Sequence, residues 1–395
     1  MVKKVCVVTG SRAEYGLLKW VIEGIRDSAS LELQLVATGT HLTPEYGFTI
    51  QEIQRDGVPI DYRVEMLLSS DTSVGVSKSL GLGVIGFSDA LESLKPDLVL
   101  LLGDRFEIFA AATAAMIARV PIAHIHGGEL TEGVIDDAMR HGITKMSHLH
   151  FVAAEEYRDR VISMGEQPDR VFNVGGLGVE SVKRLQFLSR KRVEEALGFA
   201  LLEPAFLVAF HPVTLNPEKT VAEFSEMLEA FKLLPGSQVI FTMPNSDTEG
   251  RLITEMIDSF CTLNPNAHCF QSLGQLLFLS LMAQVNAVVG NSSSGLLEAP
   301  SVGVGAINIG ERQRGRIEAR SVISVEGKRE LIHSALKTVL SEDFAYRLGS
   351  FENPYGIGEA SKRIIKTLEK TRKRSANVFL KDYFQSWVSP SCLRK

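Results

Sequence analysis

Short apolar runs recur along the whole chain, and each ends in a small or polar residue. They cover residues 5–10, 33–39, 98–104, 121–128, 148–154 and 171–176 in the first half, and 206–212, 238–245, 287–293 and 304–310 in the second. Helical patterns lie between them, for example over residues 14–27 and 107–118. Continuous apolar strands that alternate with helices are typical of a parallel sheet covered on both faces. We therefore predict an α/β protein.

The chain of 395 residues is too long for one ordinary core, and the alternation restarts in its second half. We predict two α/β domains, residues 1–177 and 178–357, then a helix over 358–374 that packs back on the first domain. The sequence assigns no role to the tail, 375–395. Ligands of open parallel sheets bind beyond the carboxyl ends of the strands. We expect the site in the cleft between the two domains.

Composition excludes several classes of protein. A net charge of −5 and a pI near 6.0 give no electrostatic reason to expect a nucleic acid or an anionic membrane as partner. The four cysteines form neither a CxxC pair nor a zinc-type spacing. The N-terminus lacks the apolar segment of a signal peptide, and no apolar run reaches about 18 residues. The predicted location is the cytoplasm.

Residues 121–141 gather titratable side chains directly behind an apolar run. They are His124, His126, Glu129, Asp136, Asp137, Arg140 and His141. Strand alternation puts both histidines of the run on one face. We predict half of an active site here. A metal site is one alternative, although no zinc-type spacing supports it, and structural histidines beside a surface Asp136–Arg140 pair are another.

Two further motifs follow strands of the first half. Ser11 and Arg12 open the first helix, so they suit an anion such as a diphosphate, or Ser11 is simply a cap. Asp104 ends the most apolar strand, where an aspartate is the N-cap of the next helix, a catalytic carboxylate, or both. Residues 81–86, GLGVIG, match GxGxxG but fall inside a predicted helix, so they are not a dinucleotide fingerprint.

The second half offers a matching pair of motifs. His211 comes just past a strand, before a proline. Residues 291–295, NSSSG, follow another strand and open a predicted helix that carries Glu298. Hydroxyls and helix N–H groups make a phosphate cradle, and Glu298 could accept hydrogen bonds from ribose hydroxyls. A capped helix without a ligand is the alternative.

Taken together, these motifs resemble the hydrolysing UDP-N-acetylglucosamine 2-epimerases, especially the branch that feeds sialic, legionaminic and related nonulosonic acids. The likeness extends to about residue 372. It rests on TGSRAEYG, TGTHL, LGDRFEIFA, HIHGGE, IDDAMRHGITKMSHLH, FHPVT, MPNSDTEG, GNSSSGLLE and INIGERQRGR. It implies two Rossmann-like domains in a glycosyltransferase-B-like fold, a homodimer, and neither a metal nor a redox cofactor.

The resemblance also implies roles for individual residues. The catalytic group would comprise Asp104, His126, Asp136 and His211, with Glu129 as a further candidate. Ser292, Ser293, Ser294 and Glu298 would bind phosphate and ribose. The supporting binders would be Arg12, His41, Arg105, Arg140, His141, Asn245, Asp247, Arg312 and Arg316.

One residue departs from the family pattern. Members that act on UDP-N-acetylglucosamine commonly carry glutamate where this chain has His126. A histidine there indicates the sub-branch that acts on UDP-N,N′-diacetylbacillosamine. It also leaves open whether His126 or Glu129 assists proton transfer.

The activity that the resemblance implies is hydrolysis of UDP-N-acetylglucosamine to N-acetylmannosamine and UDP, by elimination to a glycal and hydration. The alternative substrate is UDP-N,N′-diacetylbacillosamine, which would give 2,4-diacetamido-2,4,6-trideoxymannose. A glycosyltransferase of the same fold and a non-catalytic sugar-nucleotide-binding protein are the rivals. The sequence does not distinguish uridine from guanosine.

Overall fold

The computed structural model describes residues 2–70, 72–131, 135–213, 217–244, 250–348 and 353–371. They form two compact units. The first unit contains the residues up to Glu129, Asp136–Leu177 and 359–371. The second contains Gly178–Gly358 and the described part of Leu130–Ile135. The short segment after Glu129 thus groups with the second unit, although the sequence put all of residues 1–177 in one domain.

The first unit is built on a seven-stranded sheet in the order β3-β2-β1-β4-β5-β6-β7. Every pair of neighbours is parallel. The strands are β1 (Lys3–Thr9), β2 (Leu31–Thr38), β3 (Tyr62–Val64), β4 (Leu98–Leu102), β5 (Ile122–Ile125), β6 (Leu149–Val152) and β7 (Val171–Asn173). The strand order reverses between β1 and β4, and the loops after these two strands are where ligands bind in such sheets.

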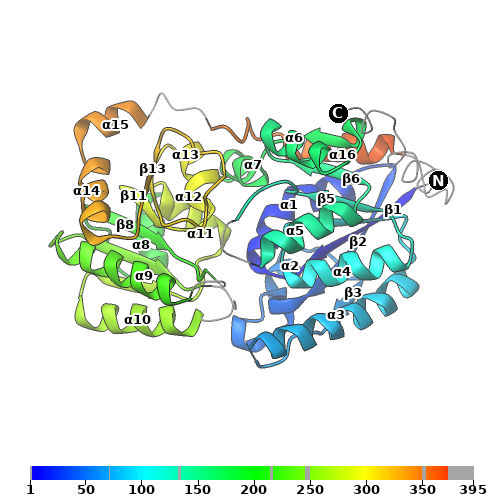
Figure 1. Cartoon of the computed structure of the whole chain (residues 1–395), viewed down its shortest axis with the longest axis horizontal. Coiled ribbons are helices and arrows are strands. Elements are labelled where there is room, and N and C mark those ends of the chain that lie inside the picture. The colour runs from blue at the N-terminus through cyan, green and yellow to red at the C-terminus, as the bar shows by residue number, and fades with distance from the viewer. Residues whose placement is uncertain are drawn as a thin grey trace, which may run out of the picture. The chain divides into compact units, whose positions relative to one another are not determined.

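Helices cover both faces of this sheet (Figure 1). They are α1 (Arg12–Arg26), α2 (Ile50–Arg55), α3 (Ser73–Leu94), α4 (Phe106–Ile117), α5 (Asp136–Met146), α6 (Glu155–Ser163) and α16 (Ala360–Lys370), with 3₁₀ turns at Gly39–Leu42, Pro44–Tyr46 and Pro168–Arg170. Helix α16 comes from the far end of the chain, yet it packs on α1. The Nζ of Lys3 binds the carbonyl oxygens of Leu368 and Thr371, which caps the last turn of α16.

The second unit repeats the plan with six parallel strands in the order β10-β9-β8-β11-β12-β13. Its strands are β8 (Ala205–Ala209), β9 (Gln238–Thr242), β10 (Ala267–Phe270), β11 (Ala287–Gly290), β12 (Gly305–Ile309) and β13 (Val322–Val325). Its helices are α7 (Leu177–Arg184), α8 (Arg190–Leu197), α9 (Pro217–Lys232), α10 (Gly250–Leu263), α11 (Gly274–Met282), α12 (Ser294–Leu297), α13 (Ala299–Val302), α14 (Arg329–Val339) and α15 (Glu342–Leu348). Here the strand order reverses between β8 and β11.

The predicted α/β class is confirmed, and residues 81–86 do lie inside a helix, α3. Among the described helices, α3 is long and apolar enough to cross a membrane by length and composition alone. In this structure it packs against α4 and β3.

Candidate functional site

Asp104 lies at the carboxyl end of β4, beside the point where the strand order reverses. Gly103 turns the chain with φ of +78°, and Arg105, not Asp104, is the N-cap residue of α4. The carboxylate of Asp104 pairs instead with the guanidinium of Arg140. The interpretation of Asp104 as a helix cap is therefore wrong, because the helix begins one residue later than a cap at Asp104 requires.

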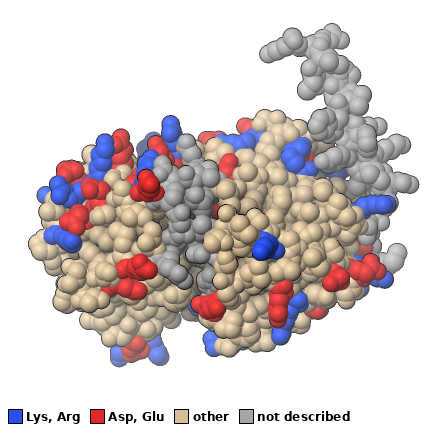
Figure 2. All heavy atoms as spheres, turned by 60° about the horizontal axis from the view of Figure 1, so that its bottom comes forward, with Lys and Arg blue, Asp and Glu red and all other residues tan. Residues whose placement is uncertain are grey.

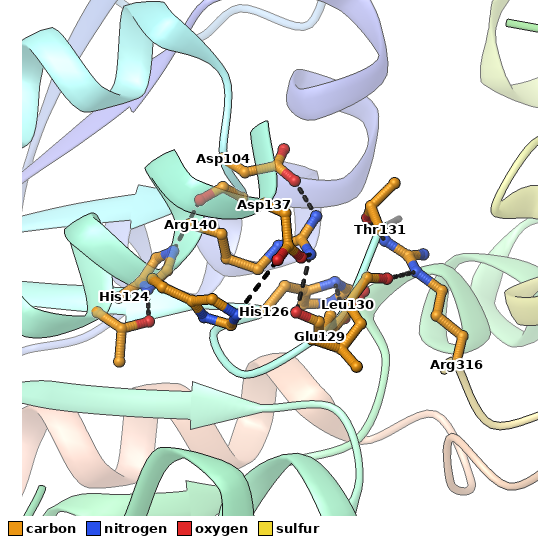
Figure 3. A network of polar contacts seen from close by, with 12 residues as sticks. Asp104, His124, His126, Glu129, Leu130, Thr131, Asp137, Arg140 and Arg316 are labelled. Carbon is orange, nitrogen blue, oxygen red and sulfur yellow. Dashed lines mark hydrogen bonds and ion pairs between the residues drawn. The ribbon is translucent and has the colours of Figure 1, made fainter. Parts of the chain in front are cut away.

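Arg140 joins three parts of this edge (Figure 3). Its side chain, on α5, is almost fully buried. Besides Asp104, it contacts Asp137 Oδ1 at 3.4 Å and donates to the main-chain oxygen of Glu129 at 2.9 Å. A guanidinium has five donors in a rigid plane, so one arginine can fix several acceptors at once. Arg140 thereby holds the loop after β5 against the end of β4.

His126 begins that loop in an unusual conformation. Its φ is +65°, in the left-handed region that non-glycine residues seldom adopt. Its Nε2 accepts a hydrogen bond from the N–H of Leu177 at 3.4 Å. Because a backbone N–H can only donate, Nδ1 carries the proton of the neutral ring. Nδ1 lies 2.9 Å from Oε1 of the buried Glu129, so both ring nitrogens are engaged.

Two other predicted histidines hold the protein framework together. His124 donates from Nε2 to the Gly103 oxygen at 2.7 Å, and its Nδ1 contacts the Thr144 hydroxyl at 3.2 Å. His41 lies between the hydroxyls of Thr9 and Thr49, at 3.0 and 2.8 Å. Burial lowers the pKa of His124 to about 3 and that of His41 to about 4. Both rings are neutral near pH 7, and His41 is completely buried.

The predicted arginines of the first unit are paired with carboxylates. Arg12 binds Glu52, and Arg105 approaches Glu107 at 3.3 Å. Next to Glu107, burial raises the pKa of Glu14 to about 7, and the Glu107 charge adds to the shift. The Glu14 carboxylate accepts from the Gly10 N–H at 2.7 Å while the Glu14 N–H binds the Ser11 hydroxyl, which caps α1. This group therefore has a structural role of its own.

Asp136 and His141 lie on α5 with Asp137 and Arg140. His141 Nε2 is 3.5 Å from Asp137 Oδ2, and burial lowers the pKa of this histidine. Among the described residues, no group of three or more His, Cys, Asp or Glu side chains could hold a metal ion. Asn245 and Asp247 lie outside the described residues.

His211 and the seryl turn, residues 292–294, lie at the carboxyl edge of the second sheet. Asn291 joins them: its side chain bonds the backbone of His211, and its own carbonyl oxygen accepts from Arg312 at 3.0 Å. The predicted helix after the turn consists of two single turns, α12 and α13, which meet at Glu298. Pro300 has no N–H, so it cannot continue the hydrogen bonding of α12.

Glu298 and Arg316 each approach main chain of the second unit. A Cβ on Gly178 would clash with Glu298 Oε1, so a glycine at 178 leaves room for this carboxylate. Arg316 donates to the Leu130 oxygen at 2.8 Å and to the Thr131 hydroxyl at 3.0 Å (Figure 3). These contacts hold the segment that follows Glu129. Sequence reasoning gave Arg316 no such role.

Two functional candidates were missed by sequence reasoning. Asn291 was seen only as the first letter of a seryl motif, and the N–H of Leu177 carries no side-chain signal at all. For Asn291 a signal did exist, because it follows the glycine that ends β11 beside the reversal of strand order.

A family model described as UDP-N-acetylglucosamine 2-epimerase matches residues 23–369. The chain belongs to this family. It is accordingly an enzyme of nucleotide-sugar epimerisation, as the sequence predicted.

Three relatives narrow the branch within this epimerase family. A GDP/UDP-N,N′-diacetylbacillosamine 2-epimerase (hydrolyzing) of Campylobacter jejuni is 42% identical over 82% of this chain and 84% of its own length. Polysialic acid biosynthesis protein P7 of Escherichia coli is 36% identical over 99% of this chain and 98% of its own length. A UDP-N,N′-diacetylbacillosamine 2-epimerase (hydrolyzing) of Legionella pneumophila is 34% identical over 93% of this chain and 96% of its own length.

A solved structure of the same family confirms the fold. The UDP-GlcNAc 2-epimerase of Neisseria meningitidis, bound to UDP-GlcNAc, matches with a TM-score of 0.80 at 23% identity. The match covers 93% of this chain and all of that one. The two parallel-sheet units of this epimerase are thus those of the glycosyltransferase-B-like fold that the sequence predicted.

Proposed function

We propose that this epimerase hydrolyses a nucleoside-diphosphate-linked 2-acetamido sugar and inverts it at C2, with UDP-N,N′-diacetylbacillosamine as its preferred substrate. The products are 2,4-diacetamido-2,4,6-trideoxymannose and UDP. The observation that carries the proposal is the network of Asp104, Arg140, His126 and Glu129 at one sheet edge (Figure 3). It holds carboxylates and an imidazole, which are side chains able to transfer protons, beside a fixed positive charge.

The reaction has two stages. A base removes the C2 proton while the bond between C1 and the diphosphate oxygen breaks, which leaves a C1–C2 double bond and free UDP. The glycal then gains a proton at C2 on the opposite face, and water adds its hydroxyl at C1. The C2 proton is only weakly acidic, so the base has to be held in position and the leaving diphosphate stabilised.

In the first unit, Asp104 and Asp136 are the acid–base residues of this proposal. The Arg140 guanidinium fixes the orientation of the Asp104 carboxylate. Glu129 is a stronger candidate than His126 for the assisting group, because both nitrogens of His126 already have neighbours. His126 then orients Glu129 from 2.9 Å.

In the second unit, the hydroxyls of Ser292, Ser293 and Ser294 bind the diphosphate, and Glu298 binds the ribose. The three serines are half-buried at the carboxyl edge of β11, which supports this role. His211 follows the neighbouring strand β8 and assists departure of the diphosphate. Helix α12 is a single turn, so the hydroxyls and Arg312 contribute more to anion binding than the helix dipole does.

Similarity and one residue favour diacetylbacillosamine over N-acetylglucosamine as the sugar. Two relatives, 42% and 34% identical, bear the diacetylbacillosamine name. A relative from Neisseria meningitidis serogroup B named UDP-N-acetylglucosamine 2-epimerase is 31% identical. His126 stands where members that act on UDP-N-acetylglucosamine commonly carry glutamate. UDP-N-acetylglucosamine, which would give N-acetylmannosamine, is the second candidate.

The test is to incubate the enzyme with UDP-N,N′-diacetylbacillosamine, its GDP counterpart and UDP-N-acetylglucosamine, each alone. Release of nucleoside diphosphate is followed with time, and the configuration at C2 of the free sugar is determined by NMR. We expect fastest release from UDP-N,N′-diacetylbacillosamine with inversion at C2. Faster turnover of UDP-N-acetylglucosamine would show that it, and not UDP-N,N′-diacetylbacillosamine, is the preferred substrate. A product that stays nucleotide-linked, transfer to an acceptor, or binding without release would each contradict a hydrolysing epimerase.

Substitution of Asp104 tests its role in proton transfer. Asp104→Asn preserves the shape of the side chain but removes the carboxylate that pairs with Arg140. We expect kcat to fall at least about a hundredfold, because positioned acid–base groups contribute factors of that size. Turnover within a few-fold of the parent enzyme, in a variant that melts at the same temperature, would exclude Asp104 as an acid–base residue.

The proposal includes a cytoplasmic homodimer. Helix α3 presents apolar side chains to solvent, among them Val74 and Ile85, at 62% and 63% exposure. Figure 2 shows that this face of the first unit carries few charged side chains. Such a face suits contact with a second copy. A molar mass of one chain in light scattering at micromolar concentration would exclude the dimer.

A further inference from the structure

Asn291 occupies the point where the strand order of the second sheet reverses. Strands β8 and β11 run side by side until Ala209 and Gly290, which are paired residues. The next residues are Phe210-His211 on one side and Asn291 on the other. In most sheets of this kind the two loops separate here and leave a crevice for ligand. In this chain the side chain of Asn291 bridges the two loops.

The bridge uses both ends of the side-chain amide. The His211 N–H donates to Asn291 Oδ1 at 2.7 Å, and Asn291 Nδ2 donates to the His211 carbonyl oxygen at 2.8 Å. The two backbone groups fix which end of the amide is oxygen, because an N–H requires an acceptor and a carbonyl requires a donor. Asn291 is only 1% exposed, so water does not compete for these bonds.

The main chain of Asn291 fixes a third segment. Its carbonyl oxygen accepts from Arg312 at 3.0 Å and from Gln313 Nε2 at 2.7 Å. The side chain therefore holds His211, the main chain holds residues 312–313, and the next residue begins the seryl turn. Asn291 thus sets the relative positions of three segments. In the proposed function, these segments bind the diphosphate or assist its departure.

We infer that Asn291 is a positioning residue that holds His211 at the correct place against the seryl turn for departure of the diphosphate. The inference rests on the proposed function and adds to it a residue that contacts no substrate. It predicts that loss of the side chain lowers kcat while nucleotide affinity is retained. The bonds to Arg312 and Gln313 use the main-chain oxygen, which any substitution at this position preserves.

The same pair of strands supplies a matched control. Asn286 lies at the other end of β11, and its Oδ1 accepts from the N–H of Ala205, the first residue of β8, at 2.9 Å. Asn286→Ala and Asn291→Ala each remove a side-chain amide that bonds the backbone of β8 or of the loop that follows it. A purely structural role predicts similar effects for the two variants. A positioning role predicts that only Asn291→Ala changes catalysis.

The experiment compares both variants with the parent enzyme. For Asn291→Ala we expect kcat to fall by about a hundredfold, because an ångström of misplacement costs about that much. The Kd for UDP should stay within about threefold, and Asn286→Ala should retain the parent kcat while its melting temperature falls. Equal kcat losses in the two variants, or a loss confined to UDP affinity, would overturn the inference.

A second measurement needs no ligand and separates this inference from the proposed function. The imidazole signals of His211 are recorded by NMR in the free protein over a pH series. We expect them to shift or broaden in Asn291→Ala and to match the parent in Asn286→Ala. Unchanged signals in Asn291→Ala would overturn the inference even in an active enzyme. If the parent enzyme released no nucleotide, the proposed function would be overturned. The NMR signals of His211 would still test whether Asn291 positions that residue. Asn291→Asp, which keeps the acceptor, provides a second variant if the alanine protein does not fold.

Discussion

At the scale of single residues, the backbone of His126 carries the most information. A non-glycine residue in the left-handed region costs roughly 1–3 kcal/mol, and such residues persist where the surroundings over-determine them. Here the His126 N–H binds the Phe151 oxygen at 2.8 Å, while the ring contacts Leu177 N–H and Glu129. The conformation is therefore held from three sides. It keeps the imidazole between the N–H of Leu177 and the carboxylate of Glu129.

This geometry predicts how substitutions at His126 will behave. A glutamine can present an acceptor to Leu177 and a donor to Glu129, whereas phenylalanine can present neither. We expect His126→Gln to keep kcat within about tenfold and His126→Phe to lose about a hundredfold or more. The measurement is steady-state turnover with its pH profile. If glutamine were as inactive as phenylalanine, His126 would itself exchange protons with the substrate.

The buried histidines predict how stability depends on pH. A histidine whose pKa is lower in the folded chain takes up its proton preferentially when the chain unfolds. The contribution of each neutral histidine to the free energy of unfolding is fully present above the ordinary pKa of 6.5. It is lost as the pH falls toward the pKa in the folded chain, about 3 for His124 and about 4 for His41. At pH 5 the loss is about 2 kcal/mol for each histidine.

Urea unfolding at pH 7.5 and pH 5 measures this loss. His124→Gln removes one titrating group, so the difference between the two pH values should shrink by about 2 kcal/mol. A variant that keeps the full difference would show that His124 is not the group responsible. A larger difference between the two pH values in His124→Gln than in the parent would contradict the sign of the effect.

The sequence could propose residues for the candidate site, but it could not predict their partners. Arg12 follows a strand, which is where anion-binding arginines occur, and only the fold shows that Glu52 neutralises it. Asp104 was predicted as a candidate for two roles, and the fold shows that the helix begins after it. Ion pairs between distant segments depend on how the chain folds, and no local pattern records them.

At the scale of elements, the central strands were predicted and three edge strands were missed. The missed strands are β3, β10 and β13, which lie at sheet edges. The central strand β4 is buried along its whole length, so it reads as a continuous apolar run. Strand β3 has a single fully buried residue, Val64, and therefore gives no comparable pattern. Edge strands have one free side, which removes the pressure for apolar residues there.

The cap on α16 gives a prediction at this scale. Lys3 reaches the carbonyl oxygens at the end of the helix and is itself buried. Lys3→Met should lower the free energy of unfolding by about 1–3 kcal/mol, because the last carbonyls lose a charged donor. Hydrogen exchange over residues 360–371 should accelerate. Lys4→Met is the control, since the Lys4 side chain is half-exposed and makes a long ion pair, 3.9 Å from Glu32. Equal effects of the two substitutions would exclude the cap.

At the scale of the whole molecule, the chain does not divide into two consecutive pieces. Its last described helix returns to the first unit, and residues after Glu129 group with the second. That helix was predicted over residues 358–374, and α16 does pack on α1 of the first unit. The excursion after Glu129 was not, since it depends on Arg316, about 185 residues further on, binding Leu130 and Thr131.

Separate cores in the two units predict a selective response to nucleotide. Each sheet packs its own apolar clusters. A ligand that binds only one unit stabilises that unit by about 2.7 kcal/mol at a hundredfold excess over Kd. We expect UDP to slow hydrogen exchange in β8, β11 and β12 and to leave β1 and β4 of the first unit nearly unchanged. Uridine, which lacks the diphosphate, should protect far less. Equal protection of both sheets by UDP would mean that the two units unfold as one cooperative body.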